Sequence, residues 1–263
     1  MGNASHNRAG SPHSLFSEWT KIARRVHSAK RVAVFLDFDG TLVGFKKNPA
    51  EVRLEASTRS LLERLACHPR VMLAFISGRS RADLRRRVGV RGALYLGLHG
   101  FESRAGIRVS AASRRRLLAA RRLIASHING LLGIWIQDKH GCIVVHYRGA
   151  AAASAAKARA AVRHAVRQGN APLQILPGKQ MWELLAPEIK GKGEAASALV
   201  RASGRGVLPF FLGDADTDEM AFAALRGAVT VRVGYYKRTK AQYSVRNPDE
   251  VRIFLERLLD VLE

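Results

Sequence analysis

The sequence predicts an α/β protein: a parallel sheet core covered by helices, with a smaller inserted α+β domain. Short continuous apolar runs recur along the chain, each with the length of a buried strand, and helical patterns lie between several of them. The middle of the chain replaces this alternation with hairpin signals, which predict the insert. The strands expected in the core are residues 32–36, 71–76, 93–97, 209–212 and 228–233.

Apolar side chains repeat at helical spacing between these runs. In residues 57–67, for example, Leu61, Leu62 and Leu65 share one face. Strands that alternate with helices are typical of a parallel sheet with helices on both sides. The helices expected in the core are residues 57–67, 82–88, 195–201 and 218–225.

The predicted insert contains helices and strands of its own. The runs GIWIQ and CIVVHY flank a four-residue segment that includes Gly141, which is a hairpin signature. A second turn, Pro177-Gly178, separates two more short apolar segments. The expected elements are helices over 114–128 and 150–167 and strands over 133–137, 142–147, 174–176 and 180–185.

These patterns divide the chain into four segments. Residues 1–14 are polar and lack the apolar centre of a secretory signal, so we expect a disordered start. The segments are a partly disordered lead-in over 1–29, a first core part over 30–107, the inserted domain over 108–186 and a second core part over 187–263.

The composition is ordinary for a soluble protein apart from its charge. The chain has 263 residues and carries 44 Lys and Arg against 21 acidic residues, a net charge of +23. No apolar run approaches the ~18 residues of a membrane span, so we expect a cytoplasmic protein without a membrane partner. Two cysteines give no disulfide framework. The positive field attracts anions, such as phosphorylated metabolites or nucleic acid.

Two carboxylates follow the first predicted core strand. Asp37 and Asp39 come directly after the run VAVFL, with Gly40 and Thr41 next to them. In open parallel sheets, ligand sites form at the carboxyl ends of the strands. Two anions buried there need a cation or strong hydrogen-bond donors. Gly40 lets the backbone turn close to a ligand, and Thr41 adds a hydroxyl donor for a phosphate.

Phosphate ligands are expected at two further places. The second strand ends in Ser77-Gly78-Arg79, which combines a hydroxyl, a bare backbone and a guanidinium suited to holding a phosphate. Lys192 lies between glycines at the start of a predicted helix. An ammonium there can reach a phosphate or neutralise a nucleophilic carboxylate.

Four acidic residues lie between positions 214 and 219, after a later apolar strand. They repel one another, and a hard divalent cation such as Mg²⁺ relieves that repulsion with oxygen ligands. Asp216 and Glu219 are expected to cap the following helix or to support the ligands. The expected metal ligands are Asp37, Asp39, Asp214 and Asp218.

The order D-x-D-G-T, S-G-R, lysine and G-D-x-x-x-D resembles the haloacid dehalogenase superfamily of phosphotransferases, over about residues 30–255. The resemblance implies a HAD-like, Rossmann-type core, a Mg²⁺ cofactor and a phosphorylated aspartate. It implies that Asp37 is the catalytic nucleophile and Asp39 the general acid and base. It also implies that Ser77 holds the transferring phosphoryl group, that Lys192 stabilises it and that Asp214 completes the magnesium site.

Finer strings resemble the trehalose-6-phosphate phosphatases within that superfamily. They include Gly97-Leu98-His99-Gly100, Asp138-Lys139, His146-Tyr147-Arg148 and Asn247-Pro248-Asp249-Glu250-Val251. This resemblance implies hydrolysis of trehalose 6-phosphate to trehalose and phosphate, in trehalose biosynthesis, by a protein whose insert is a cap. The residues that it implies for substrate binding are His99, Lys139, Arg148, Lys179 and Glu183.

The sequence departs from this family at several positions. Ala215 stands where a second aspartate is usual, and Gln137 stands where an acidic residue is common. Gly191 replaces the aspartate that often precedes Lys192. None of these positions is the nucleophile, so the departures bear on the substrate more than on phosphate-ester hydrolysis.

Alternatives remain open at this point. A related capped phosphatase with another substrate, such as sucrose phosphate or a glyceryl sugar phosphate, would share the core motifs. The charge of +23 also fits a basic nucleic-acid-binding protein on the same fold. A non-catalytic sensor would not need the intact pair Asp37 and Asp39. The expected partner is a small sugar phosphate, and the expected assembly is a monomer.

Overall fold

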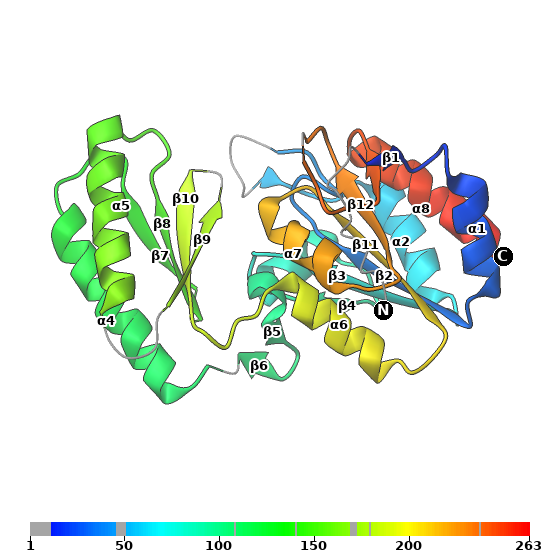
Figure 1. The fold of residues 1–263 in the computed structure, drawn as a ribbon, viewed down its shortest axis with the longest axis horizontal. Helices are drawn as coiled ribbons and strands as arrows, with labels where there is room; N and C mark the ends of the chain where they lie inside the picture. The colour runs from blue at the N-terminus through cyan, green and yellow to red at the C-terminus, as the bar shows by residue number, and fades with distance from the viewer. Residues whose placement is uncertain are drawn as a thin grey trace, which may run out of the picture. The chain divides into compact units, whose positions relative to one another are not determined.

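The structure is a computed structural model that describes residues 12–45, 51–107, 109–139, 141–168, 173–178, 180–236 and 238–263 (Figure 1). The chain divides into two compact units: a core unit, Met1–Gly100 with Gly191–Glu263, and an inserted unit, Phe101–Lys190. The inserted unit extends beyond the expected limits of 108 and 186 at both ends. A disordered start was expected over residues 1–14. Residues 1–11 of this segment lie outside the described residues.

The core unit contains the predicted parallel sheet. Its seven strands follow the order β1-β13-β12-β11-β2-β3-β4, and every neighbouring pair is parallel. The strands are β1 (His13–Ser14), β2 (Arg31–Leu36), β3 (Val71–Ile76), β4 (Leu94–Leu96), β11 (Val207–Gly213), β12 (Val229–Val233) and β13 (Tyr243–Val245). The helices are α1 (Trp19–Ser28), α2 (Ala56–Cys67), α3 (Arg81–Val88), α6 (Lys192–Ala202), α7 (Asp216–Ala224) and α8 (Pro248–Leu262).

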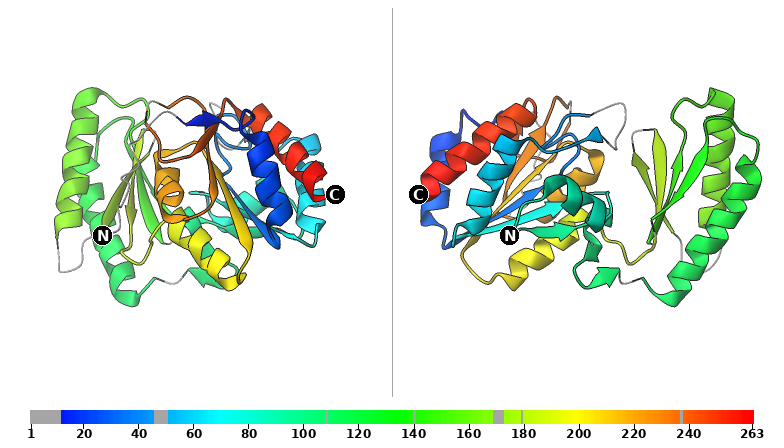
Figure 2. Two further views of the ribbon diagram at one scale, coloured as in Figure 1. Left: turned by 45° about the vertical axis from the view of Figure 1, so that its right-hand side comes forward. Right: turned by 180° about the vertical axis from the view of Figure 1, so that it is seen from behind.

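Helices cover both faces of this sheet (Figures 1 and 2). Along β2, Val32, Val34 and Leu36 belong to the apolar cluster of α1, α2, α3 and α8. Ala33 and Phe35 belong to the cluster of α6 and α7. Successive side chains of a strand point to opposite faces, so a strand covered on both sides is apolar throughout. This confirms the fold class that the continuous apolar runs predict.

Four elements at the border of the core unit, α1, α8, β1 and β13, were not expected from the sequence. Helix α1 buries Ile22 and Val26, and its Trp19 packs edge-on against Phe254 of α8 with ring centroids 6.1 Å apart. Residues 12–29, which the sequence analysis places in the lead-in, therefore include β1 and α1. Strand β1 pairs only two residues with β13, which is too short a run for a periodic pattern.

The inserted unit is a four-stranded antiparallel sheet in the order β7-β8-β10-β9, with two helices on one face (Figure 1). The hairpin expected around Gly141 is formed by β7 and β8. The elements are β5 (Glu102–Ser103), β6 (Gly106–Ile107), α4 (Ala111–Ile128), β7 (Trp135–Asp138), β8 (Cys142–His146), α5 (Ala152–Arg167), β9 (Gln174–Gly178) and β10 (Met181–Leu185).

The two faces of the inserted sheet differ in chemistry. Directly opposed residues on antiparallel strands share a face, and Val144 is opposite both Gln137 and Glu183. The alternate positions of β8 are Ile143 and Val145, and Ile143 lines a hollow together with Leu117 of α4. The apolar face therefore packs on the helices, and the other face carries polar side chains.

Basic side chains are concentrated on α4 and α5. Neither helix contains an acidic residue. Their buried positions are Ser, Ala, Leu, Ile and Val, whereas Arg115, Arg122, Arg159 and Arg163 are exposed. Much of the positive charge of the inserted unit thus lies on the solvent side of its helices. No helix in the described parts of the chain is both long and apolar enough to cross a membrane.

The chain leaves and re-enters the core unit at neighbouring points. It leaves after the short 3₁₀ helix η2 (Leu98–Gly100) and returns at Gly191. A β-carbon placed on Gly100 would lie 3.8 Å from the carbonyl oxygen of Gly191. The same atom would lie 2.4 Å from Cβ of Ala195, so this approach of the two segments requires a residue without a side chain.

Replacing Phe254 by alanine should lower the free energy of unfolding by about 3–5 kcal/mol, because its fully buried ring packs against Phe210 and Trp19. Ile253→Ala is the matched control, since Ile253 lies on the same helix but is partly exposed. Urea unfolding measures both variants. A control as destabilised as Phe254→Ala would contradict this account of the core.

Candidate active site

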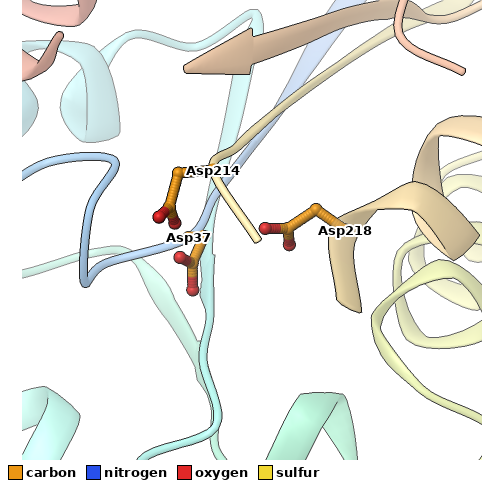
Figure 3. Close-up of side chains that lie close together, drawn as sticks. All are labelled: Asp37, Asp214 and Asp218. Carbon is orange, nitrogen blue, oxygen red and sulfur yellow. The ribbon is translucent and has the colours of Figure 1, made fainter. Parts of the chain in front are cut away.

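Two aspartates meet at the carboxyl ends of adjacent core strands. Asp37 follows β2 and Asp214 follows β11, and these parallel strands pair Leu36 with Leu212. The backbone N–H of Asp37 donates a hydrogen bond to the carbonyl oxygen of Leu212 at 3.0 Å. Because neighbouring parallel strands end at the same edge of the sheet, the two carboxylates come together (Figure 3).

Asp218 joins them from the first turn of α7. One carboxylate oxygen from each of Asp37, Asp214 and Asp218 lies within 4.8 Å of the others, and Figure 3 draws the three side chains close together. Asp37 is 4% exposed and Asp218 is fully buried. Buried carboxylates at this spacing need compensating positive charge.

Lys192, the first residue of α6, supplies part of that charge. Its Nζ donates to Oδ1 of Asp37 and to Oδ1 of Asp218, both at 2.8 Å, and the residue is 2% exposed. Burial opposes the charged form, but Asp218 and Asp37 outweigh burial and raise the pKa of Lys192 above its ordinary value. The lysine therefore stays protonated and bridges two elements of the site.

One ammonium does not balance three carboxylates. Burial, reinforced by the charge of Asp218, raises the pKa of Asp214 to about 6. Burial also raises the pKa of Asp37, with Lys192 opposing the rise and Asp218 and Asp214 adding to it. A further cation would favour the ionised form of both groups.

The donor set fits a divalent metal ion. Oδ1 of Asp214 is buried and has no hydrogen-bond partner among the residues that the structure describes. Asp218, in contrast, uses Oδ1 for Lys192 and Oδ2 for the backbone N–H of Ala215 at 2.9 Å. Carboxylate oxygens are the ligands that Mg²⁺ prefers. Asp37 and Asp214 are therefore best suited to bind the ion directly, with Asp218 beside them.

The carboxylate of Asp39 is held by Arg79. Nε of Arg79 donates to Oδ2 of Asp39 and Nη2 donates to Oδ1, both at 2.6 Å. A two-pronged contact of this kind fixes the orientation of the carboxylate as well as its position. Asp39 was expected among the metal ligands, but within the described residues the acidic cluster consists of Asp37, Asp214 and Asp218.

The expected phosphate ligands lie at the same edge of the sheet. Strand β3 pairs with β2, with Phe75 opposite Leu36, so Ser77 and Asp37 both follow these strands at the same edge of the sheet. Ser77 is buried, and its Oγ accepts the backbone N–H of Arg79 at 3.2 Å. Thr41 is also buried, and its Oγ1 has no hydrogen-bond partner within the described chain. Two hydroxyls therefore lie in the loops that follow β2 and β3.

His99 packs on the turn that contains Gly78. A β-carbon on Gly78 would lie 2.9 Å from Cε1 of His99, and the backbone N–H of His99 donates to the carbonyl oxygen of Ser77 at 2.9 Å. Leu98 and His99 both have positive φ, 48° and 59°. Consecutive non-glycine residues in this region are strained, and such strain is concentrated at functional sites.

The other expected sugar ligands belong to the inserted unit, whereas His99 belongs to the core unit. Nζ of Lys139 is 3.1 Å from Oε1 of Glu183, whose side chain is almost fully buried. Arg148 lies two residues after the end of β8. Lys179 lies outside the described residues. The structure thus brings Lys139 and Glu183 together.

Two polar residues beside this pair were not expected as site residues. Nε2 of His146 lies 3.1 Å from Oε1 of Gln137, and the His146 ring stacks on Trp135 with centroids 3.7 Å apart. Burial and the charge of Lys139 lower the pKa of His146 to about 4, so its imidazole is neutral at physiological pH.

Arg232 is a further residue that the sequence analysis missed. It lies in β12, and its Nη1 donates to the carbonyl oxygen of Ala215 at 3.0 Å and to Oε1 of Glu219 at 3.1 Å. These contacts brace the loop that carries Asp214. A signal was present in the sequence, because an arginine inside the otherwise apolar run AVTVRV contradicts a strand buried on both faces.

Comparison with known proteins places this site in a family. A model of the trehalose-phosphatase family matches residues 35–249. The trehalose-phosphate phosphatase of Mycobacterium avium is 35% identical over 254 residues, which cover 90% of this chain and 64% of that protein. The chain therefore spans just under two thirds of the length of this relative.

Solved structures share the fold. The C-terminal domain of the Candida albicans trehalose-6-phosphate phosphatase superposes with a TM-score of 0.80 at 20% identity, covering 97% of this chain and 99% of that one. A haloacid dehalogenase-like hydrolase from Bacteroides thetaiotaomicron superposes with a TM-score of 0.64 at 17% identity, covering 87% and 100%. The strand order and these superpositions define a haloacid dehalogenase-like fold.

Within that class the family is settled by the extent of the sequence match. The chain belongs to the trehalose-phosphatase family, which confirms the resemblance that its sequence motifs carry.

Gly40→Ala should weaken Mg²⁺ binding by about tenfold or more. Gly40 has a φ of +88°, and a β-carbon there would lie 2.1 Å from Oδ2 of Asp214, so this carboxylate would have to move. Gly44→Ala is the control, because it changes the same loop where no atom lies within 4 Å of the added carbon. Calorimetric titration with MgCl₂ compares them, and equal affinities would refute the proposed ligand geometry.

Proposed function

We propose that the protein hydrolyses trehalose 6-phosphate to trehalose and phosphate through a phosphorylated aspartate at Asp37. The main support is the environment of Asp37, a buried carboxylate at a strand end that accepts a hydrogen bond from Lys192, in a chain of the trehalose-phosphatase family. The relative from Mycobacterium avium is named a trehalose-phosphate phosphatase, and we extend that substrate to this chain. A role in trehalose biosynthesis implies a cytoplasmic setting.

The proposed reaction has two steps. First, a carboxylate oxygen of Asp37 attacks the phosphorus, the bond between phosphorus and the sugar oxygen breaks, and protonated Asp39 gives its proton to that oxygen. Trehalose leaves as a neutral alcohol. Second, Asp39 takes a proton from a water molecule whose oxygen attacks the phosphorus, and the bond to Asp37 breaks. Phosphate is released and both aspartates return to their initial states.

Phosphoryl transfer depends mainly on positioning and charge stabilisation. In this proposal Lys192, held by Asp218, offsets the negative charge that the phosphoryl group brings to Asp37. The hydroxyls of Ser77 and Thr41 and the backbone at Gly78 bind the phosphoryl oxygens. Asp37 and Asp214, with Asp218 beside them, would hold Mg²⁺, which neutralises charge on the bound phosphate.

Sugar recognition is assigned in this proposal to His99, Lys139, Arg148, Lys179 and Glu183. Lys139 and Glu183 already form a pair at 3.1 Å, and Glu183 is 2% exposed. A fixed ammonium and a fixed carboxylate offer donors and acceptors to sugar hydroxyls. Buried polar groups of this kind discriminate strongly against ligands that leave them unpaired.

Asp37→Asn should abolish phosphate release from trehalose 6-phosphate, because an amide is a far poorer nucleophile than a carboxylate. A phosphate assay with and without Mg²⁺ measures this, with glucose 6-phosphate and sucrose 6-phosphate as comparison substrates. Asp260→Asn, at an exposed position of α8, is the matched control and should retain full activity. Residual turnover by Asp37→Asn would exclude this nucleophile, and faster wild-type release from a comparison substrate would exclude the proposed sugar.

Glu183→Gln should slow hydrolysis of trehalose 6-phosphate by about tenfold to a hundredfold, because it removes the charge that pairs with Lys139. Hydrolysis of p-nitrophenyl phosphate, which has no sugar, should change little. The control is Arg159→Gln, at an exposed position of α5 in the same unit. Steady-state kinetics measure kcat/KM for both substrates. An equal loss of kcat/KM on the two substrates would argue against a sugar-binding role.

A further inference from the structure

Arg79 lies between two carboxylates. Its Nε and Nη2 bind Asp39, and its third nitrogen, Nη1, donates to Oδ2 of Asp83 at 2.8 Å. The guanidinium is planar, so the direction of its contact with Asp83 sets the plane of its contact with Asp39. The three side chains are 14–29% exposed, which places the array at the border of the site rather than in open solvent.

Asp83 is itself firmly held. Nε of Arg87 donates to Oδ2 of Asp83 at 2.9 Å, and Nη1 of Arg87 donates to the carbonyl oxygen of Val52 at 2.9 Å. Arg87 is buried. Burial alone would raise the pKa of Asp83, but hydrogen bonds from Arg87, Arg79 and Arg86 lower it well below its ordinary value. Asp83 is therefore a firmly held carboxylate, joined through Arg87 to a second segment of the core unit.

The local sequence explains this arrangement. Asp83 lies in the first turn of α3, where Ser80 is the N-cap and accepts the backbone N–H of Asp83 at 3.3 Å. Arg87 lies four residues after Asp83 on the same helix, so helical geometry directs its side chain toward this carboxylate. Arg79 precedes the N-cap and contacts Asp83 from the turn before the helix. The backbone of Arg79 is also fixed, because its N–H donates to Oγ of Ser77 and its carbonyl oxygen accepts the N–H of Leu98.

We propose that Asp83 is a positioning residue for the reaction: it fixes the guanidinium of Arg79, and Arg79 fixes the orientation of the Asp39 carboxylate. The inference rests on the proposed function, in which Asp39 transfers the proton to and from the reacting oxygens. Without Asp83, the guanidinium of Arg79 loses one of the contacts that fix its plane. Asp39 then keeps a charged partner but loses its fixed direction.

Asp83 has a third arginine partner, Arg86, which makes no contact with Asp39 or Arg79 among the hydrogen bonds described above. Nη2 of Arg86 donates to Oδ1 of Asp83 at 2.6 Å, but the side chain of Arg86 is 70% exposed. Exposed ion pairs of this kind contribute little to stability. Arg86 therefore provides a matched control, since its removal takes one hydrogen bond from Asp83 and leaves the connection to Arg79 and Asp39 in place.

The test compares two leaving groups in a single turnover. Trehalose is a poor leaving group, because its departing oxygen must be protonated. p-Nitrophenolate is a good leaving group and departs without a proton. Asp83→Asn should slow the release of trehalose by about tenfold or more, because misplaced catalytic groups lose rate steeply. Release of p-nitrophenolate in the first turnover should stay within about twofold of wild type, since that step uses no proton. Arg86→Gln should leave both rates unchanged.

Two further variants protect the test against a general loss of structure. Arg79→Lys keeps a positive charge and leaves Asp83 with Arg86 and Arg87, but it cannot bind Asp39 through two prongs, so it should reproduce the selective loss. In an Asp39→Asn background, Asp83→Asn should add nothing to the loss with trehalose 6-phosphate, because both changes act through one group. Thermal unfolding of each variant confirms that the compared proteins are folded.

The outcomes separate this inference from the proposed function. Equal slowing of both leaving groups by Asp83→Asn and Arg79→Lys, or no slowing at all, would overturn the positioning role while Asp37-dependent turnover persists. Wild-type protein without Asp37-dependent turnover of either substrate would overturn the proposed function itself. An additive loss in the Asp39→Asn background would also overturn the role, because Asp83 would then act through something other than Asp39.

Discussion

A buried ammonium group holds the acidic centre of this protein together. Lys192 connects Asp37, which follows β2, with Asp218 in the first turn of α7. Without it, the carboxylates would repel one another in surroundings that solvate charge poorly. Because Lys192 is the first residue of α6, the start of that helix, the end of β2 and the start of α7 are mutually fixed. The bridge formed by Lys192 thus fixes the positions of the carboxylates around which the rest of the site is built.

Much of the fold follows from patterns that the sequence displays openly. Apolar runs such as VAVFL have no polar face because helices cover both sides of β2, and the hairpin around Gly141 follows from a turn between two apolar segments. The elements at the edge were harder to predict. Strand β1 forms through two pairs of residues, and α1 is held by packing such as that of Trp19 on Phe254, which only the folded chain brings together.

The site divides in a similar way. Convergence of Asp37 with Asp214 follows from parallel strands that end at one edge, so strand-end motifs suffice to predict it. The side-chain partners do not follow. The motif of Arg79 suggests a phosphate ligand, yet its guanidinium binds Asp39. Asp218 lies in the acidic cluster, as expected, but both its oxygens also accept hydrogen bonds from protein donors, which the motif does not show. Such choices depend on rotamers and on competition among neighbours, which a motif does not encode.

The adjacency of Gly100 and Gly191 makes the architecture modular. A chain that exits and re-enters at touching points adds almost no loop-closure cost to the framework that it interrupts. Ninety residues can therefore diverge, or be exchanged for another insert, without changing strand order or register in the framework. Yet the return point immediately precedes Lys192. Any replacement insert must therefore rejoin the framework at the same residue, because the next residue is the lysine that bridges Asp37 and Asp218.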